Sequence, residues 1–279
     1  MTKALVLGGG GVTGIAWELG VLCGLQRAGV PLGDADYVIG TSAGSVVGTV
    51  LTSGIDLGAA VAVQAQEAPP PRPGGRNGGN SVNGAMAAFA VLGDPSVPAE
   101  QSRMRVGAFA LSAEVGAEEA YVSRISSLLP ARDWPARELR IVAVDTADGR
   151  EVVFDSTSGV PVDLAVAASC AVPGLMPPIT INNKRYMDGG VRLGAGADLA
   201  AGAGHLVVIA PMAALDRDRI RREMASTGAA HTLLIEPDEA AAEAIGLNFM
   251  DPSRRAPSVH AGLRQGESLA EAVRAVWRG

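Results

Sequence analysis

Near the start of the chain, a short run of hydrophobic residues typical of a β-strand is followed by hydrophobic residues at helical spacing, and this order occurs twice. Residues 3–7 form a short apolar run typical of a buried β-strand, and residues 15–28 carry leucines at helical spacing. Four glycines, 8–11, separate the two. A second apolar run at 37–39 is followed by small residues and by a helical pattern that starts at residue 46. This β-α-β-α order predicts a parallel sheet covered by helices.

The rest of the chain supplies strands that pair in both senses. Asp148-Gly149 lies between two β-prone runs, which is a strong hairpin signal, and Asn182-Asn183 marks a second turn. We therefore expect an α/β fold with a mixed, mostly parallel central sheet. The further strands are expected at 139–145, 151–155, 179–181, 185–187, 205–210 and 232–236, and the further helices at 98–129, 162–169, 215–226 and 268–277.

One segment interrupts this pattern. Residues 68–83 contain four prolines and four glycines, and almost no apolar side chain that could be buried. Such a composition predicts a mobile loop, and we expect it to gate the functional site. Because 48% of the 279 residues are hydrophobic, the chain can bury a large core, and residues 1–279 are expected to form a single domain.

Charge and composition exclude several functions. The chain carries 29 acidic and 23 basic residues, for a net charge of −6, so it lacks the basic surface that nucleic-acid binding requires. Its two cysteines give no metal-binding spacing, and no apolar run reaches the roughly 18 residues of a membrane span. A cytoplasmic protein is expected, with peripheral membrane contact as the alternative. The arginines between 217 and 222 could touch anionic lipid, but the acids among them favour a solvated helix face.

A first candidate for chemistry is the pentapeptide 40–44, Gly-Thr-Ser-Ala-Gly. It fits G-x-S-x-G at a strand-to-helix junction, where a nucleophilic serine sits on a sharp, strained turn. Gly40 and Gly44 leave the space that such a turn needs, and the helix that follows directs its free amides at developing negative charge. The alternative is a plain turn in which Ser42 caps the helix.

A second candidate is the glycine run that follows the first strand. Its amides point into the region above the carboxyl edge of the sheet, which is the geometry of an oxyanion hole built from Gly9, Gly10, Gly11 and Val12. Gly9, Gly11 and Gly14 also match G-x-G-x-x-G, the fingerprint of a dinucleotide site. That site needs an acid after the second strand, whereas the nearby acids, 34 and 36, precede it. An oxyanion loop is therefore favoured over a dinucleotide site and over a plain turn.

A third candidate is Asp188-Gly189-Gly190 at the end of a β-prone run. The two glycines let the backbone pass close to another element, and the carboxylate stands at the strand end. Taken alone, Asp-Gly is an ordinary turn. The motif gains meaning only beside the other two.

Together these three motifs resemble the patatin-like phospholipase family. Residues 168–174, Ala-Ser-Cys-Ala-Val-Pro-Gly, look like the segment that leads towards the aspartate in bacterial members. The resemblance covers essentially the whole chain and implies a three-layer α/β/α sandwich with a Ser-Asp dyad that uses no histidine, metal or cofactor. It implies that Ser42 is the nucleophile, Asp188 its base and the glycine loop the oxyanion hole. One residue departs from the pattern, because Thr13 stands where the family usually has Arg or Lys; Arg192 is a candidate substitute.

The chemistry expected is hydrolysis of a lipid or other acyl ester. Ser42 would take the acyl group while Asp188 accepts the hydroxyl proton, and water would then release the acid. Two alternatives remain open at this point. One is an α/β-hydrolase with a Ser-His-Asp triad, for which His205, His231 and His260 are the only histidines. The other is a non-catalytic module that binds an acyl or phosphate group.

Overall fold

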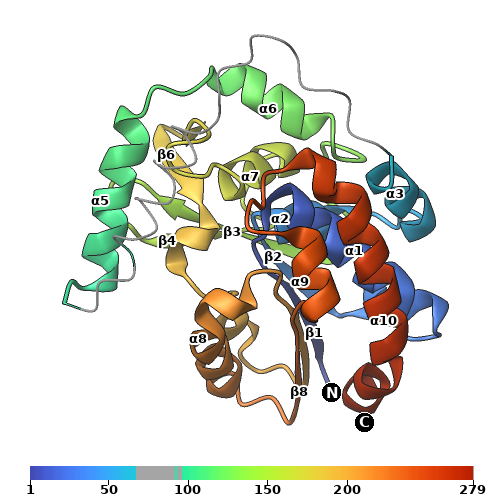
Figure 1. Ribbon diagram of the computed structural model, residues 1–279. Helices are drawn as coiled ribbons and strands as arrows, with labels where there is room; N and C mark the ends of the chain where they lie inside the picture. Colours follow the sequence, from blue (N-terminus) through green and yellow to red (C-terminus); the bar gives the residue numbers. More distant parts are fainter. Residues whose placement is uncertain (67–91, 93–95, 279) are drawn as a thin grey trace. The chain divides into compact units, whose positions relative to one another are not determined.

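The computed structural model describes residues 1–66, 92 and 96–278, and its strands and helices alternate as in an α/β fold (Figure 1). The predicted mobile loop at 68–83 lies outside the described residues. The chain divides into two compact units, and strand β3 (Glu138–Asp145) begins in the first and ends in the second. The first unit contains Met1–Ala68, Pro135–Arg140 and Gly194–Gly279, and the second contains Pro69–Trp134 and Ile141–Leu193.

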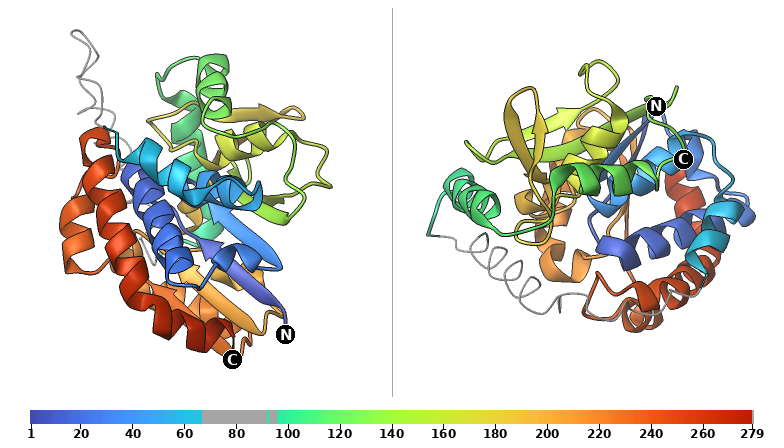
Figure 2. Two further views of the ribbon diagram at one scale, coloured as in Figure 1. Left: turned by 90° about the vertical axis from the view of Figure 1, so that its right-hand side faces the viewer. Right: turned by 90° about the horizontal axis from the view of Figure 1, so that it is seen from above.

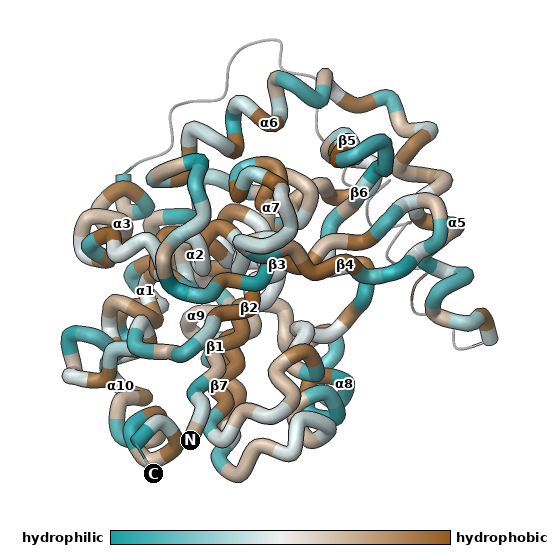
Figure 3. The backbone as a smooth tube through the Cα atoms, turned by 180° about the vertical axis from the view of Figure 1, so that it is seen from behind, coloured by the Kyte–Doolittle hydropathy of each residue, from teal (hydrophilic) through white to brown (hydrophobic). Residues whose placement is uncertain are grey.

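The first unit is built on parallel strands in the order β2-β1-β7-β8. Strands β2 and β7 are buried at every position, as expected for parallel strands covered on both faces. Figure 3 shows β1 and β7 as strongly hydrophobic segments. The strands are β1 (Lys3–Leu7), β2 (Tyr37–Thr41), β7 (His205–Ile209) and β8 (His231–Ile235).

Helices cover both faces of these strands. Helix α1 (Gly11–Arg27) connects β1 to β2, and α8 (Ala213–Ser226) connects β7 to β8, so the two connections step along the sheet in opposite directions. Because such crossovers are right-handed, α1 and α8 must lie on opposite faces. Figure 1 shows them on opposite sides of β1 and β8. The unit thus has the predicted three layers.

Helix α10 (Arg255–Trp277) packs directly against α1, backbone to backbone (Figure 2). A Cβ atom added to Gly20 or Gly24 would lie 2.4 or 2.3 Å from a carbonyl oxygen of α10. A Cβ atom on Gly262 or Gly266 would lie 2.3 Å from a carbonyl oxygen of α1. Later residues of α1 meet later residues of α10, so the helices run parallel, and only glycine fits where they touch.

A buried amide joins this helix pair to the sheet. The Trp17 indole Nε1–H donates to Oε1 of Gln265 at 3.0 Å, and Gln265 Nε2 donates to the main-chain oxygen of Glu236 at 2.7 Å. At the other end of α10, the Trp277 indole donates to Asp34 Oδ1 at 2.6 Å. Both tryptophans are thereby fixed in the core.

Some helix positions differ from the prediction. Helix α10 begins at Arg255 rather than at 268, and the part before 268 contains Gly262 and Gly266, which contact α1. Helix α1 begins at Gly11, inside the glycine run, rather than at residue 15. Several short elements of this unit were not predicted or were placed differently: η1 (Leu32–Asp34), α2 (Ala43–Thr52), α3 (Leu57–Gln64), η3 (Ala197–Ala200), α9 (Glu239–Ile245) and η4 (Pro252–Arg254).

The second unit pairs its strands antiparallel. Strand β6 (Lys184–Asp188) lies between β5 (Ile179–Ile181) and β3, and β4 (Glu151–Phe154) also pairs with β3. The turns predicted at 148–149 and 182–183 are confirmed; Gly149 in the first and both asparagines in the second have positive φ. The region expected to be helical over 98–129 is two helices. The remaining elements are α5 (Ala99–Ser112), α6 (Glu118–Ser126), α7 (Val162–Ser169) and η2 (Gly189–Arg192).

Candidate active site

Ser42 occupies a strained position between a strand and a helix. Strand β2 ends at Thr41 and α2 begins at Ala43, and Ser42 between them has φ 53° and ψ −117°. A residue with a side chain rarely adopts this conformation, and doing so costs of order 1–3 kcal/mol. The strain presents the side chain at the tip of a sharp turn, as the G-x-S-x-G motif requires.

The glycines on either side of Ser42 are demanded by the packing of the turn. A Cβ atom on Gly40 would lie 2.5 Å from the carbonyl oxygen of Gly44. A Cβ atom on Gly44 would lie 2.1 Å from the carbonyl oxygen of Leu7. The turn therefore folds tightly against β1 only because both positions lack a side chain.

The glycine loop is attached both to the sheet and to this turn. The Gly8 N–H donates to the Ile209 oxygen at 2.9 Å, and the Gly8 oxygen accepts from the Gly44 N–H at 2.9 Å. A Cβ atom on Gly9 would lie 3.7 Å from Cβ of Ser42. The first unit thus brings two of the three predicted motifs side by side.

The start of α1 supplies amides at this point. Gly10 is the N-cap and Gly14 N–H makes the first helical bond, to the Gly10 oxygen at 2.8 Å. Gly11 and Val12 therefore lie in the first turn, whose N–H groups have no acceptor within a helix. These amides and the positive end of the helix dipole can stabilise an oxyanion.

The strand order places this loop at a topological switch point of the sheet. The connections from β1 and β7 leave the carboxyl edge towards opposite faces, and ligands of α/β sheets bind at such points. Gly10 borders the connection after β7, because a Cβ atom there would lie 2.7 Å from Cβ of Pro211. The loop and the serine thus lie at the point of the sheet where the strand order reverses.

Two other serines, Ser45 in the same unit and Ser169 in the second unit, are less suited to be nucleophiles. Ser45 and Ser169 are completely buried, whereas Ser42 retains 9% exposure. The Ser45 hydroxyl donates to the Ser42 main-chain oxygen at 2.7 Å, and the Ser169 hydroxyl donates to the Val142 oxygen at 2.6 Å. Both hydroxyls therefore donate hydrogen bonds to main-chain oxygens.

Two of the histidines lie at the opposite end of the parallel strands. His205 and His231 begin β7 and β8 and stack with ring centroids 4.8 Å apart, while His205 Nδ1 lies 2.7 Å from the Val276 oxygen. At about 3.3 Å per residue, a five-residue strand puts them about 13 Å from the carboxyl edge, where Ser42 lies. His260 is exposed on α10.

Asp188 closes strand β6 in the second unit. Its side chain is 2% exposed, and Oδ1 accepts the Gly190 N–H at 2.7 Å, so Asp188 caps η2, which begins at Gly189. The Asp188 N–H donates to the Ala171 oxygen at 3.0 Å, which joins the Asp-Gly-Gly motif to the segment 168–174. These two predicted features therefore meet within one unit.

Tyr121 lies in the electrostatic field of this carboxylate. Its hydroxyl donates to the Cys170 oxygen at 2.7 Å. Burial, and secondarily electrostatic interactions with Cys170 and Asp188, raise the pKa of Tyr121 well above its ordinary value, and Arg124 offsets only part of this rise. The phenol therefore stays neutral. Nothing in the sequence pattern had pointed to Tyr121.

The structure also places the residues connected with the unusual Thr13. Thr13 is fully buried and bonds the main-chain oxygen of Phe249, and Arg192 forms an ion pair with Glu151 in the second unit. Sequence reasoning missed Phe249, because a main-chain carbonyl leaves no mark on composition or spacing.

Glu18 was also missed. It lies on α1, one turn beyond Gly14, and it is completely buried, with hydrogen-bond partners for neither carboxylate oxygen among the described residues. Burial raises the pKa of Glu18 well above its ordinary value, and the nearby Gly8 amide offsets only part of this rise. Gly8 already donates to Ile209. Burial therefore favours the protonated form of Glu18, close to the glycine loop.

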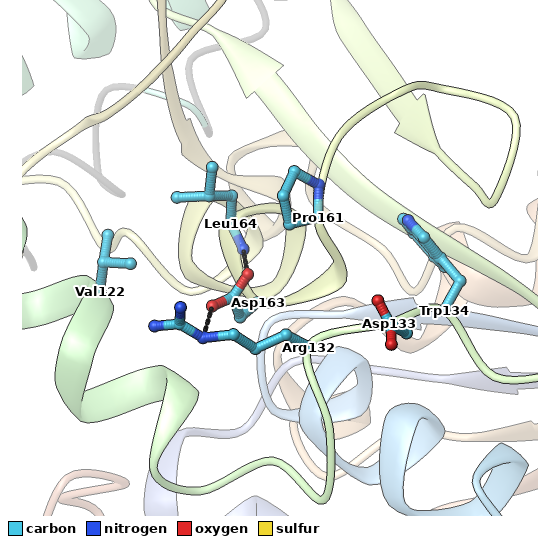
Figure 4. Close-up of a pocket in the computed structure, with 7 residues that line it drawn as sticks. All are labelled: Val122, Arg132, Asp133, Trp134, Pro161, Asp163 and Leu164. Carbon is cyan, nitrogen blue, oxygen red and sulfur yellow. Dashed lines mark hydrogen bonds and ion pairs between the residues drawn. The ribbon is translucent and has the colours of Figure 1, made fainter.

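A cavity of about 410 Å³ lies in the second unit and contains none of the predicted site residues (Figure 4). At its edge Asp163 accepts from Arg132 Nε at 3.2 Å and from the Ser126 hydroxyl at 2.7 Å. In the described ranges no three His, Cys, Asp or Glu residues group as a metal site, and no helix there has the length and apolar character to cross a membrane. The cavity is lined by Val122, Arg132, Asp133, Trp134, Pro161, Asp163 and Leu164.

Comparisons with known proteins agree with the fold. A family model described as patatin-like phospholipase matches residues 5–201. The crystal structure of VipD from Legionella pneumophila is similar over 97% of this chain and 67% of that chain, with a TM-score of 0.50 and 16% identity. The type III effector ExoU matches over 95% of this chain with a TM-score of 0.40 and 19% identity, and its complex with SpcU from Pseudomonas aeruginosa matches with a TM-score of 0.33 and 17% identity. This chain spans about half of ExoU, 53% and 52% in the two structures. No curated protein matches in sequence.

Proposed function

The chain belongs to the patatin-like phospholipase family, and from this membership we propose that it is a serine hydrolase that cleaves acyl esters of lipids. One observation carries the proposal. The strained Ser42 and the amides of the first turn of α1, which have no acceptor within the helix, meet at the carboxyl edge of one parallel sheet. A nucleophile beside preorganised donors is the arrangement that acyl transfer needs.

In the first half of the proposed reaction, Ser42 Oγ attacks the carbonyl carbon of the ester. The carbonyl oxygen becomes an oxyanion, which accepts hydrogen bonds from amides among Gly9, Gly10, Gly11 and Val12. The Asp188 carboxylate takes the hydroxyl proton and passes it to the leaving alcohol as the ester bond breaks. An acyl-serine remains.

In the second half, water attacks the acyl-serine. Asp188 takes a proton from the water and returns it to Ser42 Oγ, and the fatty acid leaves. Carboxylates are weak bases, so the amides must provide much of the transition-state stabilisation. Esters suit such a site better than amides, because an alkoxide needs less help from an acid than an amine does.

The mechanism treats both units as parts of one hydrolase domain and requires the Asp188 carboxylate to reach Ser42. Two observations speak against the alternatives. A Ser-His-Asp triad is disfavoured because the two strand histidines lie at the amino edge of the sheet. A binding module is disfavoured because holding a phosphate or acyl group does not require the strain stored at Ser42.

Fluorophosphonate labelling with peptide mapping tests the proposal. We expect one adduct, on Ser42, and we expect Ser42→Ala to abolish both labelling and ester turnover. An adduct on Ser45 or Ser169 would show that the labelled serine, and not Ser42, is the nucleophile. A folded protein that neither labels nor turns over a panel of lipid and soluble esters would instead be a binding module.

A further inference from the structure

The turn at 246–251, between α9 and η4, is a fixed element. Asn248 Oδ1 accepts the Met250 N–H at 3.1 Å, and the Asn248 main-chain oxygen accepts the Asp251 N–H at 3.1 Å. Asp251 Oδ1 then caps η4 by accepting the Ser253 N–H at 2.9 Å and its hydroxyl at 2.7 Å. Gly246, at φ 71°, ends α9. The turn therefore holds its shape by its own hydrogen bonds.

This turn lies on the first turn of α1. The Phe249 oxygen accepts the Thr13 N–H at 3.2 Å and the Thr13 hydroxyl at 3.4 Å. A Cβ atom on Gly11 would lie 2.5 Å from the Phe249 oxygen and 3.0 Å from Met250 Sδ. Phe249 and Met250 thus cover Gly11 so closely that only glycine fits beneath them.

The contact with Phe249 uses the Thr13 amide and leaves the Gly11 and Val12 amides for the proposed oxyanion hole. A helix leaves its first N–H groups without acceptors, and here Phe249 accepts only that of Thr13. The same contact fixes the backbone of Gly11 and Val12, whose amides are the proposed oxyanion donors. Donors that are fixed beforehand need no rearrangement during the reaction, whereas small misplacements are costly in rate.

We propose that the turn at 246–251 is a positioning element for the oxyanion hole, and that the pair Thr13–Phe249 holds the glycine loop in place of a charged residue. The inference rests on the proposed function. Thr13 supports the loop through its main-chain N–H and, as the part that depends on threonine, through its hydroxyl. Phe249 and Met250 act through the loop.

The test loosens the turn without touching the loop. Asn248→Ala combined with Asp251→Ala removes the side-chain bonds that shape the turn and keeps its main-chain bond, and Leu247→Ala is the matched control, because Leu247 is fully exposed at the same turn. With a soluble short-chain ester, we expect the double variant to lose about tenfold in kcat with KM within about twofold, and Leu247→Ala to behave as wild type. Thr13→Val should also lower kcat, and Thr13→Ser should restore it.

Hydrogen exchange over residues 8–14 gives a readout that does not depend on activity. We expect faster exchange of these amides in the double variant and in Thr13→Val, but not in Leu247→Ala or Thr13→Ser. Unchanged exchange in the folded double variant, or a rise in KM with kcat unchanged, would overturn the positioning role. If wild type hydrolyses no ester, the proposed function fails, while exchange still decides whether the turn orders the loop.

Discussion

Replacing Glu18 should make the protein more stable. Glu18 is completely buried on α1, and neither of its oxygens has a hydrogen-bond partner among the described residues. Burial raises its pKa, so the folded protein keeps a proton that the unfolded chain releases near its ordinary value of 4.5. Glu18→Leu removes both oxygens and keeps similar volume, and Glu18→Gln keeps the shape of the neutral acid.

The size of the effect follows from two terms. A buried polar group without a partner costs about 1–3 kcal/mol, so Glu18→Leu should raise the free energy of unfolding by about 2 kcal/mol near pH 5. Because the folded state binds the extra proton, wild-type stability falls as pH rises above 4.5 towards the raised pKa. Each unit of that interval adds about 1.4 kcal/mol to the difference, which should therefore be larger at pH 8.

Urea unfolding at pH 5 and pH 8 measures both terms. Glu243→Gln, at an exposed position of α9, is the control and should follow wild type at both pH values. If Glu18→Leu is less stable than wild type, or if its advantage is the same at the two pH values, then Glu18 is ionised and has a partner, and the reasoning is wrong. Glu18→Gln should lose the pH-dependent part alone.

Three further predictions concern the strained turn at Ser42, the proposed Ser42–Asp188 dyad and the contact of α1 with α10. The free energy of unfolding of Ser42→Gly should be about 1 kcal/mol higher than that of Ser42→Ala, because glycine adopts a positive φ without strain. Equal urea midpoints of the two variants would show that position 42 is not strained. Asp188→Asn should lower ester turnover by a factor of ~10⁴, while alanine at each of the three histidines should leave it nearly unchanged; the reverse result would favour a histidine-based hydrolase. Gly262→Val should cost more than about 3 kcal/mol in thermal or urea unfolding, whereas Gly116→Ala, with open space around it, should cost less than about 1 kcal/mol.

Features that depend on local backbone conformation could be predicted from the sequence. The turn at Ser42 and the hairpin at 182–183 need small or Asn residues at particular places, and these residues mark them. Features that depend on packing were missed. The contacts of Gly262 and Gly266 with α1 are an example, since the partner that requires these glycines is far away in the sequence.

The contact between Thr13 and Phe249 joins residues 236 positions apart and uses a carbonyl that any residue could provide. Nothing in the pattern could indicate it. The burial of Glu18 likewise follows from tertiary packing, because a single acid in a helix usually faces solvent. The Ser42–Asp188 dyad and the loop at 68–83 remain predictions.

The parallel contact of α1 with α10 also sets an order in time. Trp17 and Gln265, which bond across it, are 248 residues apart, so at about 5–20 residues per second α10 is synthesised roughly 10–50 s after α1. Until then, the glycine face of α1 has no partner in its unit, and glycine favours a helix poorly. The helix whose first turn carries the loop amides is thus secured late in translation. A nascent chain that stops before α10 would hold Ser42 and the turn at 246–251, but it would lack the helix that packs on the glycine face of α1.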